Sequence, residues 1–346
     1  MHKVAAFVAT LSFVFFAFAS AAMTSPATKS SSSPASMPRP ASQTQTYSVI
    51  PVEGQIGLHF TADFLKTCLD QIDRNKPDMI ILKINSPGGS VAETEKIIEL
   101  LTRRTKVRTV AYIERAVSAA AIISLSCKEI YVDQRAVIGG AYAYATNSWN
   151  MPEDVGEKMQ SVWRATCRSA AELGGHQSII AESMIDKDIE LSLGQKDGRP
   201  IVVEGMEPGK VFKRRGKILT MTASEAVACG LAEGVTTSWE DFRAKLGVKA
   251  WKEDAVAVRL YTIRKREVDE AVARIERLKK AFDSAISQTI NENSNRAAAP
   301  LAHAISILGQ VADLAKKYPG LQLDEGKIRD LMRELEGHRA RIQRGG

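Results

Sequence analysis

The chain has 346 residues, of which 45% are apolar, and a formal net charge of +7. This length allows one large or two smaller domains, and the apolar share is enough for a buried core, which excludes a wholly disordered protein. The chain contains five histidines, and four cysteines without a C-x-x-C pair, so the usual zinc spacing is absent and we expect neither a metal nor a cofactor.

The N-terminal segment has the residue order of a secretory signal. Lys3 precedes an apolar run from Val4 to Phe18, and the small residues 19–22 follow it. We therefore interpret residues 1–22 as a cleaved signal peptide and expect export, into a bacterial periplasm. The alternative is an uncleaved membrane anchor, because the apolar run is nearly long enough to cross about 30 Å of hydrocarbon.

A segment rich in Ser and Pro follows the signal, at residues 23–46. It lacks large apolar side chains and cannot bury enough surface to offset the entropy of folding. The composition therefore predicts a disordered linker between the signal and the first domain.

The four cysteines are scattered along the chain. Export permits disulfides, but three of the four fall on the apolar side of predicted helices. We therefore expect buried free thiols, with disulfides as the alternative. The cysteines are Cys68, Cys127, Cys167 and Cys229.

Residues 47–250 alternate between strand and helix patterns. Short apolar runs predict strands, and apolar residues every three or four positions predict helices. Such alternation is typical of an α/β domain whose parallel strands are joined by crossover helices. In chain order, the predicted elements are a strand from Tyr47 with a glycine break, a helix over 61–75, a strand over 79–84, a helix over 91–102, a strand over 107–113, a helix from Ser118, strands over 129–133 and 136–140, a helix over 151–173, short strands with turns within 189–219, and a helix over 222–229 that begins with a Thr222–Glu225 capping box.

Residues 251–346 have a different character and predict a basic helical tail. From Arg259 onward there are 17 Lys and Arg against 12 Asp and Glu, a difference of +5. An apolar stripe at three- and four-residue steps predicts a helix suited to a helical partner, as in a coiled coil, for dimerisation or docking. The alternative is an inert solvated face. The stripe consists of Val268, Val272, Ile275, Leu278, Phe282, Ile286 and Ile290.

A Ser-Pro-Gly-Gly turn at residues 86–89 follows the apolar run 79–84. It fits neither the phosphate-binding nor the dinucleotide-binding glycine pattern, which excludes the usual nucleotide loops. Two glycines let the chain turn tightly and expose backbone N–H groups beside the start of a helix. The turn therefore predicts donors for an oxyanion.

Ser118 is the candidate nucleophile. It lies at the exit of a predicted strand and the start of an apolar helix, where its hydroxyl and the N–H of Ala119 face the same way and the helix dipole favours negative charge. The alternative interpretation is a helix N-cap, the usual role of serine at this place.

Three segments in succession resemble signatures of the Clp/SppA/NfeD serine peptidases. They are INSPGG at 84–89, RAVSAAAIISLSCKEIYVDQRAVIGG at 115–140 and GKILTMTASEAVACGLAEG at 216–234. Their order and distances are similar to the NfeD branch, over about residues 47–247. The resemblance implies a ClpP/crotonase-like spiral of β-β-α units, followed here by an α-helical extension.

The same resemblance assigns roles to individual residues. It implies that Gly89 and Ala119 supply the N–H groups of the oxyanion hole and that Gly88 shapes the turn. In the NfeD branch the base is a lysine about forty residues after the serine on a helix, which here is Lys158. A lysine acts as a base only in a dry setting, which we expect Val155 and Val162 to provide.

Histidine is a less suitable base in this sequence. The segment in which Clp peptidases carry their histidine has none here. His59 and His176 remain as candidates that could approach the site, and a structural role is the preferred interpretation for both.

These observations lead to three hypotheses on function. The first is an exported serine endopeptidase with a Ser118/Lys158 dyad, which cleaves exposed apolar peptide segments of proteins such as membrane proteins. The second is an inactive peptidase-fold scaffold that binds partners through the tail. The third, disfavoured by export, is a crotonase-type enzyme acting on acyl thioesters. We expect a homo-oligomer and no nucleic-acid partner.

Overall fold

The structure of the protein is a computed structural model that describes residues 45–104, 107–146, 152–247, 251–291 and 296–344. The predicted signal peptide and the linker up to residue 44 lie outside the described residues. The last two residues assigned to the linker, 45 and 46, belong to the first strand instead, because they pair with Trp251 and Lys252.

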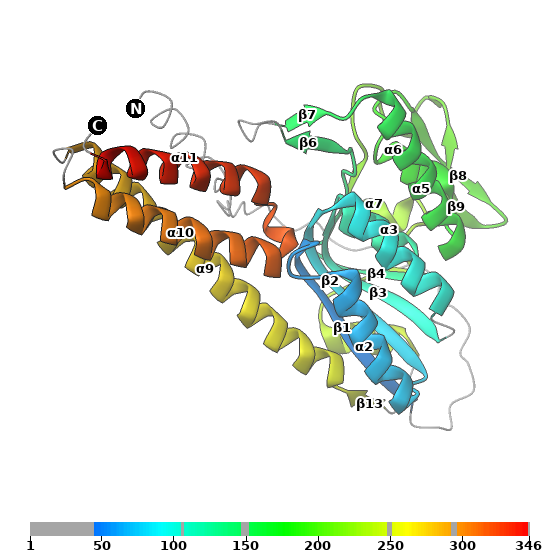
Figure 1. Cartoon of the computed structure of the whole chain (residues 1–346). Coiled ribbons are helices and arrows are strands. Elements are labelled where there is room, and N and C mark those ends of the chain that lie inside the picture. The colour runs from blue at the N-terminus through cyan, green and yellow to red at the C-terminus, as the bar shows by residue number, and fades with distance from the viewer. Residues whose placement is uncertain (1–44, 105–106, 147–151, 248–250, 292–295, 345–346) are drawn as a thin grey trace.

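An eight-stranded sheet forms the centre of the molecule (Figure 1). Its strands run in the order β11-β5-β3-β2-β1-β13, and β4 joins β3 to β12. All pairs are parallel except β11 with β5, so the predicted parallel arrangement is confirmed. The strands are β1 (Gln45–Ile56), β2 (Met79–Gly89), β3 (Arg108–Val117), β4 (Glu129–Asp133), β5 (Val137–Gly139), β11 (Thr220–Thr222), β12 (Gly234–Thr236) and β13 (Trp251–Asp254).

Helices cover both faces of the sheet. Successive side chains of a strand point to opposite faces, so the apolar residues of the strands form a cluster on each face. One face carries a large apolar cluster in which Leu82 and Ile113 meet the helices α2 to α4. The other face carries a smaller aromatic cluster, in which Tyr112 packs on Phe242 of α8. The helices of this part are α2 (Ala62–Asn75), α3 (Val91–Glu99), continued by a π-turn (η1, Leu100–Arg104), α4 (Ala119–Leu125), α5 (Glu157–Gly174), α6 (Ser178–Ser183), α7 (Ala223–Ala228) and α8 (Trp239–Lys245).

Two small sheets lie beside the main one. The three-stranded sheet has the order β10-β8-β9, and β6 pairs with β7. The helix predicted over 151–173 begins only at Glu157, so its predicted start is wrong. The residues before it pair as a strand, and Gly156 has a φ of 77° that a helix does not allow. The strands are β6 (Tyr144–Thr146), β7 (Pro152–Asp154), β8 (Leu191–Lys196), β9 (Arg199–Glu204) and β10 (Val211–Lys213).

Two local predictions are confirmed. Thr222 and Glu225 form the predicted capping box at the start of α7. The four cysteines are buried and free, and burial raises the pKa of the Cys68 and Cys127 thiols to about 12.

The C-terminal part forms a helical bundle that projects from the sheet (Figure 1). It consists of α9 (Val256–Asn291), α10 (Ala298–Lys317), a 3-10 turn (η2, Pro319–Leu321) and α11 (Glu325–Gln343). The predicted apolar stripe of α9 packs within this bundle, so its helical partner is in the same chain. The exception is Ile290, whose side chain is 53% exposed.

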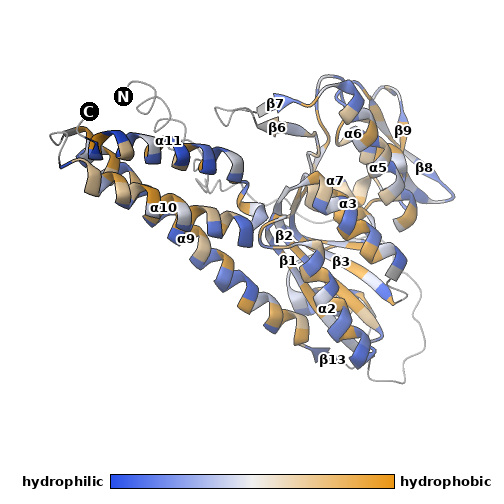
Figure 2. Ribbon diagram, viewed as in Figure 1, coloured by the Kyte–Doolittle hydropathy of each residue, from blue (hydrophilic) through white to orange (hydrophobic). Residues whose placement is uncertain are grey.

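Helix α10 is the most apolar member of the bundle (Figure 2). Among the described residues it is the one helix long and apolar enough to cross a membrane, by length and composition. In the structure, Leu301, Ile307 and Leu308 are buried against the neighbouring helices.

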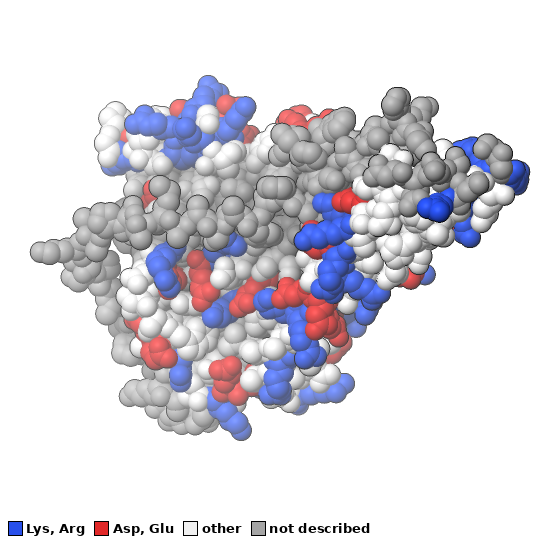
Figure 3. Space-filling view, turned by 90° about the vertical axis from the view of Figure 1, so that its left-hand side faces the viewer, with Lys and Arg blue, Asp and Glu red and all other residues white. Residues whose placement is uncertain are grey.

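Charged side chains of both signs are intermixed on the face shown in Figure 3. On α9 they form surface ion pairs such as Lys265 with Asp269 and Arg266 with Glu270. Exposed pairs of this kind contribute little to stability, so the apolar cluster of the bundle is its main support.

Candidate active site

The Ser-Pro-Gly-Gly segment is the last part of β2 and not a turn after it. The predicted strand over 79–84 is therefore too short, because residues up to Gly89 pair with β1. Ser86 is fully buried, donates its hydroxyl to the Gly54 carbonyl at 2.6 Å and accepts the N–H of Gly88 at 3.1 Å. This serine holds the segment in place. Sequence reasoning missed it, although a serine two residues before a glycine is a known turn-forming signal.

Both glycines are required by their surroundings. Gly88 has a φ of 97° and Gly89 a φ of 152°, values that side chains disfavour. A Cβ on Gly89 would lie 2.1 Å from the Ile56 carbonyl oxygen. No other residue type fits at these two positions without a shift of the backbone.

The N–H of Gly89 points away from β1. Ser90 donates its N–H to the Ile56 carbonyl at 3.0 Å, and Ile56 lies opposite Gly89 in the parallel register. A parallel bridge of this kind uses the N–H of the residue after Gly89, so the Gly89 N–H is not the donor to β1. Gly89 is also an exposed residue.

Gly88 brings this segment against the candidate nucleophile. A Cβ on Gly88 would lie 2.6 Å from the Cβ of Ser118 and 3.1 Å from the backbone nitrogen of Ala119. The Gly-Gly segment and the start of α4 are therefore adjacent, as predicted from the sequence. Four predicted residues, Gly88, Gly89, Ser118 and Ala119, come together here.

Ser118 has a strained backbone, with a φ of 56° and a ψ of −128°. Residues other than glycine in such regions cost of order 1–3 kcal/mol and persist where the surroundings hold them. Here the N–H of Ser118 donates to the Gly139 carbonyl of β5 at 2.9 Å. Ser118 does occupy the N-cap position of α4, as the alternative interpretation expected, but its hydroxyl makes no capping hydrogen bond.

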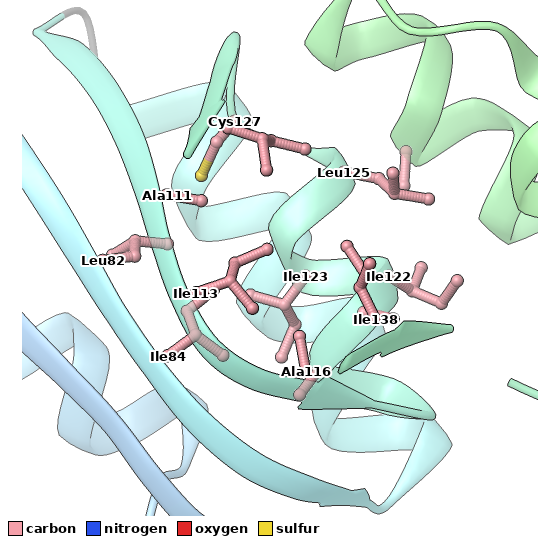
Figure 4. Packing of buried hydrophobic residues seen from close by; sticks show 14 of the residues in the cluster. Leu82, Ile84, Ala111, Ile113, Ala116, Ile122, Ile123, Leu125, Cys127 and Ile138 are labelled. Carbon is pink, nitrogen blue, oxygen red and sulfur yellow. The ribbon is translucent and has the colours of Figure 1, made fainter. Parts of the chain in front are cut away.

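The start of α4 supplies a further donor. Ala119 is the first residue of the helix, and the first N–H groups of a helix have no partner within it. Helix α4 is buried along its whole length against the sheet, with Ile122 and Ile123 among the apolar residues of β2, β3 and β5 (Figure 4). The core thereby fixes the direction of this N–H.

Lys158 lies in the first turn of α5, and its side chain is exposed. The prediction of a dry setting is wrong for the structure as it stands. Val155 is half-buried, but Val162 is 53% exposed and Met159 56% exposed. Among the described residues, no hydrogen bond or ion pair joins Lys158 to Ser118.

The start of α5 is nevertheless tied to the segment that follows β5. The side-chain amide of Gln160 donates to the Ala143 carbonyl at 2.6 Å, and the Trp163 indole donates to the Ala141 carbonyl at 2.8 Å. Ala141 lies two residues after Gly139, which binds Ser118. The first two turns of α5 are thus anchored on the strand exit that also holds the serine.

The two histidines considered as bases have structural partners. His176 makes a hydrogen bond with the Cys127 carbonyl at 2.7 Å, and burial lowers the pKa of its ring. His59 accepts the N–H of Gln55 at 3.2 Å and lies 3.4 Å from Asp269. Among the described residues, no three His, Cys, Asp or Glu gather as in a metal site.

Comparisons with known proteins identify relatives of the sheet domain. The family described as "NfeD1b, N-terminal domain" matches residues 46–255. The chain is 32% identical over 206 residues to Membrane protein NfeD1b of Bacillus subtilis (strain 168), which is 59% of this chain and 41% of that protein. This chain therefore spans less than half the length of that curated relative.

A solved structure supports the fold. The chain is similar to the 1510-N membrane-bound stomatin-specific protease, in a lysine-to-alanine variant with a substrate peptide, with a TM-score of 0.50 and 17% identity over 65% of this chain and 99% of that one. A 1510-N membrane protease specific for a stomatin homolog from Pyrococcus horikoshii gives a TM-score of 0.42 and 18% identity, over 64% and 98%. The predicted ClpP-like fold is confirmed.

Proposed function

Because this chain belongs to the NfeD1b family over residues 46–255, we propose that it is an exported serine endopeptidase that cleaves exposed apolar peptide segments. The single observation that carries this proposal is the geometry of Ser118. Its hydroxyl makes no capping hydrogen bond, and its backbone is held in a strained conformation beside the N–H of Ala119 and the Gly88-Gly89 segment. Such an arrangement suits attack on a carbonyl.

The first half of the reaction forms an acyl-enzyme. The Ser118 oxygen attacks the peptide carbonyl, and its proton passes to a neutral amine of Lys158. The oxyanion accepts hydrogen bonds from Gly89 and Ala119, and the released amine takes the proton back from Lys158.

The second half regenerates the serine. Lys158 removes a proton from water as the water attacks the acyl carbonyl. The acid product leaves, and Ser118 regains its proton from Lys158.

Lys158 needs a covering that the free protein lacks. Tyr144, Met159 and Val162 are all more than half exposed, near the start of α5. We propose that an apolar peptide covers these side chains and thereby removes water from Lys158, which favours the neutral amine. Catalysis would then depend on the apolar character of the substrate.

The location and partners belong to the same proposal. The curated relative is a membrane protein, and the solved structure with a TM-score of 0.50 is of a membrane-bound protease. We propose a periplasmic enzyme, held at the membrane if the N-terminal segment is not cleaved, that acts as a homo-oligomer on apolar segments of membrane proteins.

A second candidate function is a scaffold without catalysis that binds partners through residues 251–346. The exposure of Lys158 favours this second candidate, because a solvated lysine that no hydrogen bond joins to the serine is a poor base. The two candidates differ in whether Ser118 is a reactive nucleophile.

A serine-directed fluorophosphonate separates the candidates. We expect covalent labelling of the full chain, its loss in Ser118→Ala, and a decrease of about 100-fold in Lys158→Ala. Lys128→Ala is the matched control, since Lys128 is an exposed lysine just beyond the C-terminal end of α4, and the labelling rate of this variant should not change. Labelling that survives Ser118→Ala would refute the enzyme proposal. Equal labelling rates in Lys158→Ala and Lys128→Ala would show that Lys158 is not the base.

A further inference from the structure

The helical bundle makes close contacts with one loop of the sheet domain, residues 54–60, which begins at the glycine break in β1 and includes the last residues of that strand. The Tyr261 hydroxyl of α9 donates to the Glu53 carbonyl at 3.0 Å, just before this loop. One turn further along, the Arg264 guanidinium donates to the Leu58 carbonyl at 2.9 Å. These bonds join α9 to both ends of a short backbone segment.

Two other contacts complete this junction. His59 lies 3.4 Å from the Asp269 carboxylate of α9. The 3-10 turn between α10 and α11 also reaches the loop, because a Cβ on Gly320 would lie 1.9 Å from the Gly57 carbonyl oxygen. The tip of the loop is thus enclosed between α9 and this turn.

The junction is well packed on the bundle side. Tyr261 is 4% exposed, and its ring meets Phe64 of α2 at a centroid distance of 6.0 Å. The Arg264 guanidinium stacks over Tyr318, 5.7 Å from the ring centroid. Donors held in this way keep one direction, because their side chains have few other conformations available.

The same loop holds the oxyanion segment from the other side. The Gly54 carbonyl accepts the Ser86 hydroxyl, and the Ile56 carbonyl accepts the N–H of Ser90 at 3.0 Å. Gln55 and Ile56 lie opposite Gly88 and Gly89 in the register of β1 and β2. A shift of this loop therefore shifts the backbone that carries the Gly89 N–H.

We propose that Arg264 and Tyr261 are positioning residues, through which the C-terminal bundle fixes residues 54–60 and so the direction of the Gly89 N–H. The bundle begins at Val256, beyond the residues that the family match covers, so this is a property of this chain and not of the matched domain. The fixing of residues 54–60 by Arg264 and Tyr261 does not depend on the proposed peptidase function, whereas its effect on catalysis rests on that function.

The catalytic consequence is specific. An oxyanion donor acts on the transition state more than on substrate binding, so displacing it lowers the maximal rate and leaves affinity unchanged. A change that only unfolded the bundle would instead reduce the amount of reactive protein.

Two variants of the full chain and a matched control test this proposal. Arg264→Met combined with Tyr261→Phe removes both donors and keeps most of the apolar volume. Arg274→Met is the control, because Arg274 lies on the same helix and binds Gln310 within the bundle, away from the loop. Arg264→Lys in place of Arg264→Met should give a smaller loss, since lysine can also donate to the Leu58 carbonyl.

Two measurements are made on each variant. Fluorophosphonate kinetics give the maximal labelling rate and the probe affinity separately. We expect the rate of the double variant to fall about tenfold with unchanged affinity, and that of Arg274→Met to stay within about twofold. Hydrogen exchange of the peptide spanning residues 84–90 should be about tenfold faster in the double variant than in the control.

The outcomes separate the two proposals. If the unchanged protein is not labelled at all, the peptidase proposal fails while hydrogen exchange still tests the positioning. Equal exchange at residues 84–90 in the double variant and in Arg274→Met would overturn the inference. If the double variant does not fold, Tyr261→Phe alone removes a single O–H group and is judged by the same criterion.

Discussion

The two halves of the candidate site are built in different ways. On one side, Ser118 and the Gly-Gly segment belong to the central sheet and to a fully buried helix, and bonds to Gly139 and Ile56 hold them. On the other side, Lys158 stands exposed in the first turn of α5. In the proposed reaction, the nucleophile and the oxyanion donors are therefore preformed, and we propose that the base side is completed only when a peptide binds.

This contrast predicts the largest losses on the preformed side. Gly88→Ala would place a Cβ 2.6 Å from that of Ser118, and Gly89→Ala would place one 2.1 Å from the Ile56 carbonyl. We expect each change to lower the fluorophosphonate labelling rate by about 100-fold or more, because it moves or removes an oxyanion donor. The rate constant of labelling is the measurement.

The control for these changes is Gly216→Ala. Gly216 has a φ of 81°, but a Cβ there meets nothing within 4 Å. It therefore reproduces the cost of a side chain in the left-handed region without the clash. Losses of the same size in all three variants would show that backbone strain alone explains them.

A smaller effect is expected on the exposed side. Val162→Asp adds a carboxylate and removes apolar cover one turn from Lys158. We expect about a tenfold lower labelling rate with an apolar peptide phosphonate, because a charged neighbour and added water both keep the amine protonated. Leu173→Asp is the control, since Leu173 is 54% exposed at the other end of α5. Equal rates in the two variants would show that apolar cover is irrelevant.

The smallest effect concerns the anchor between the two halves. Trp163→Phe keeps an aromatic ring but removes the N–H bond to the Ala141 carbonyl. We expect the free energy of unfolding to fall by about 1 kcal/mol, and labelling by about threefold through a less ordered α5 start. Denaturant unfolding and labelling are measured on the same preparation. A full loss of labelling without loss of stability would assign Trp163 a direct role instead.

The sequence predicted the preformed half better than the exposed half. The Gly-Gly pair was recognisable because its role depends on local backbone conformation, which glycine reveals. Ser118 was preferred to a plain N-cap only through the resemblance of three segments to the Clp/SppA/NfeD peptidases. The extent of β2 was not recognisable, because residues 86–89 join the strand through pairing, Gly88 and Gly89 with β1 and Ser86 with Ala116 of β3. Pairing is a non-local contact, and single-sequence patterns do not report it.

The same limit explains the errors around Lys158. The helix was predicted to begin at 151, and the strand β7 before it was not predicted. Three paired residues are too few to show the alternation of apolar and polar residues that indicates a strand. A dry setting was expected from Val155 and Val162, which are close in sequence. Burial depends instead on what packs over α5, and most of that face is open in the structure. The contacts of Arg264 and Tyr261 with residues 53–58 are likewise non-local.

A crystal structure of the fluorophosphonate adduct is the most direct test of whether the Ser118 oxygen and the N–H groups of Gly89 and Ala119 meet at one tetrahedral centre. The account predicts phosphorus bound to the Ser118 oxygen, and a phosphoryl oxygen about 2.7–3.1 Å from the backbone nitrogens of both Gly89 and Ala119. An adduct on another residue, or a phosphoryl oxygen directed to solvent with both nitrogens out of reach, would contradict it.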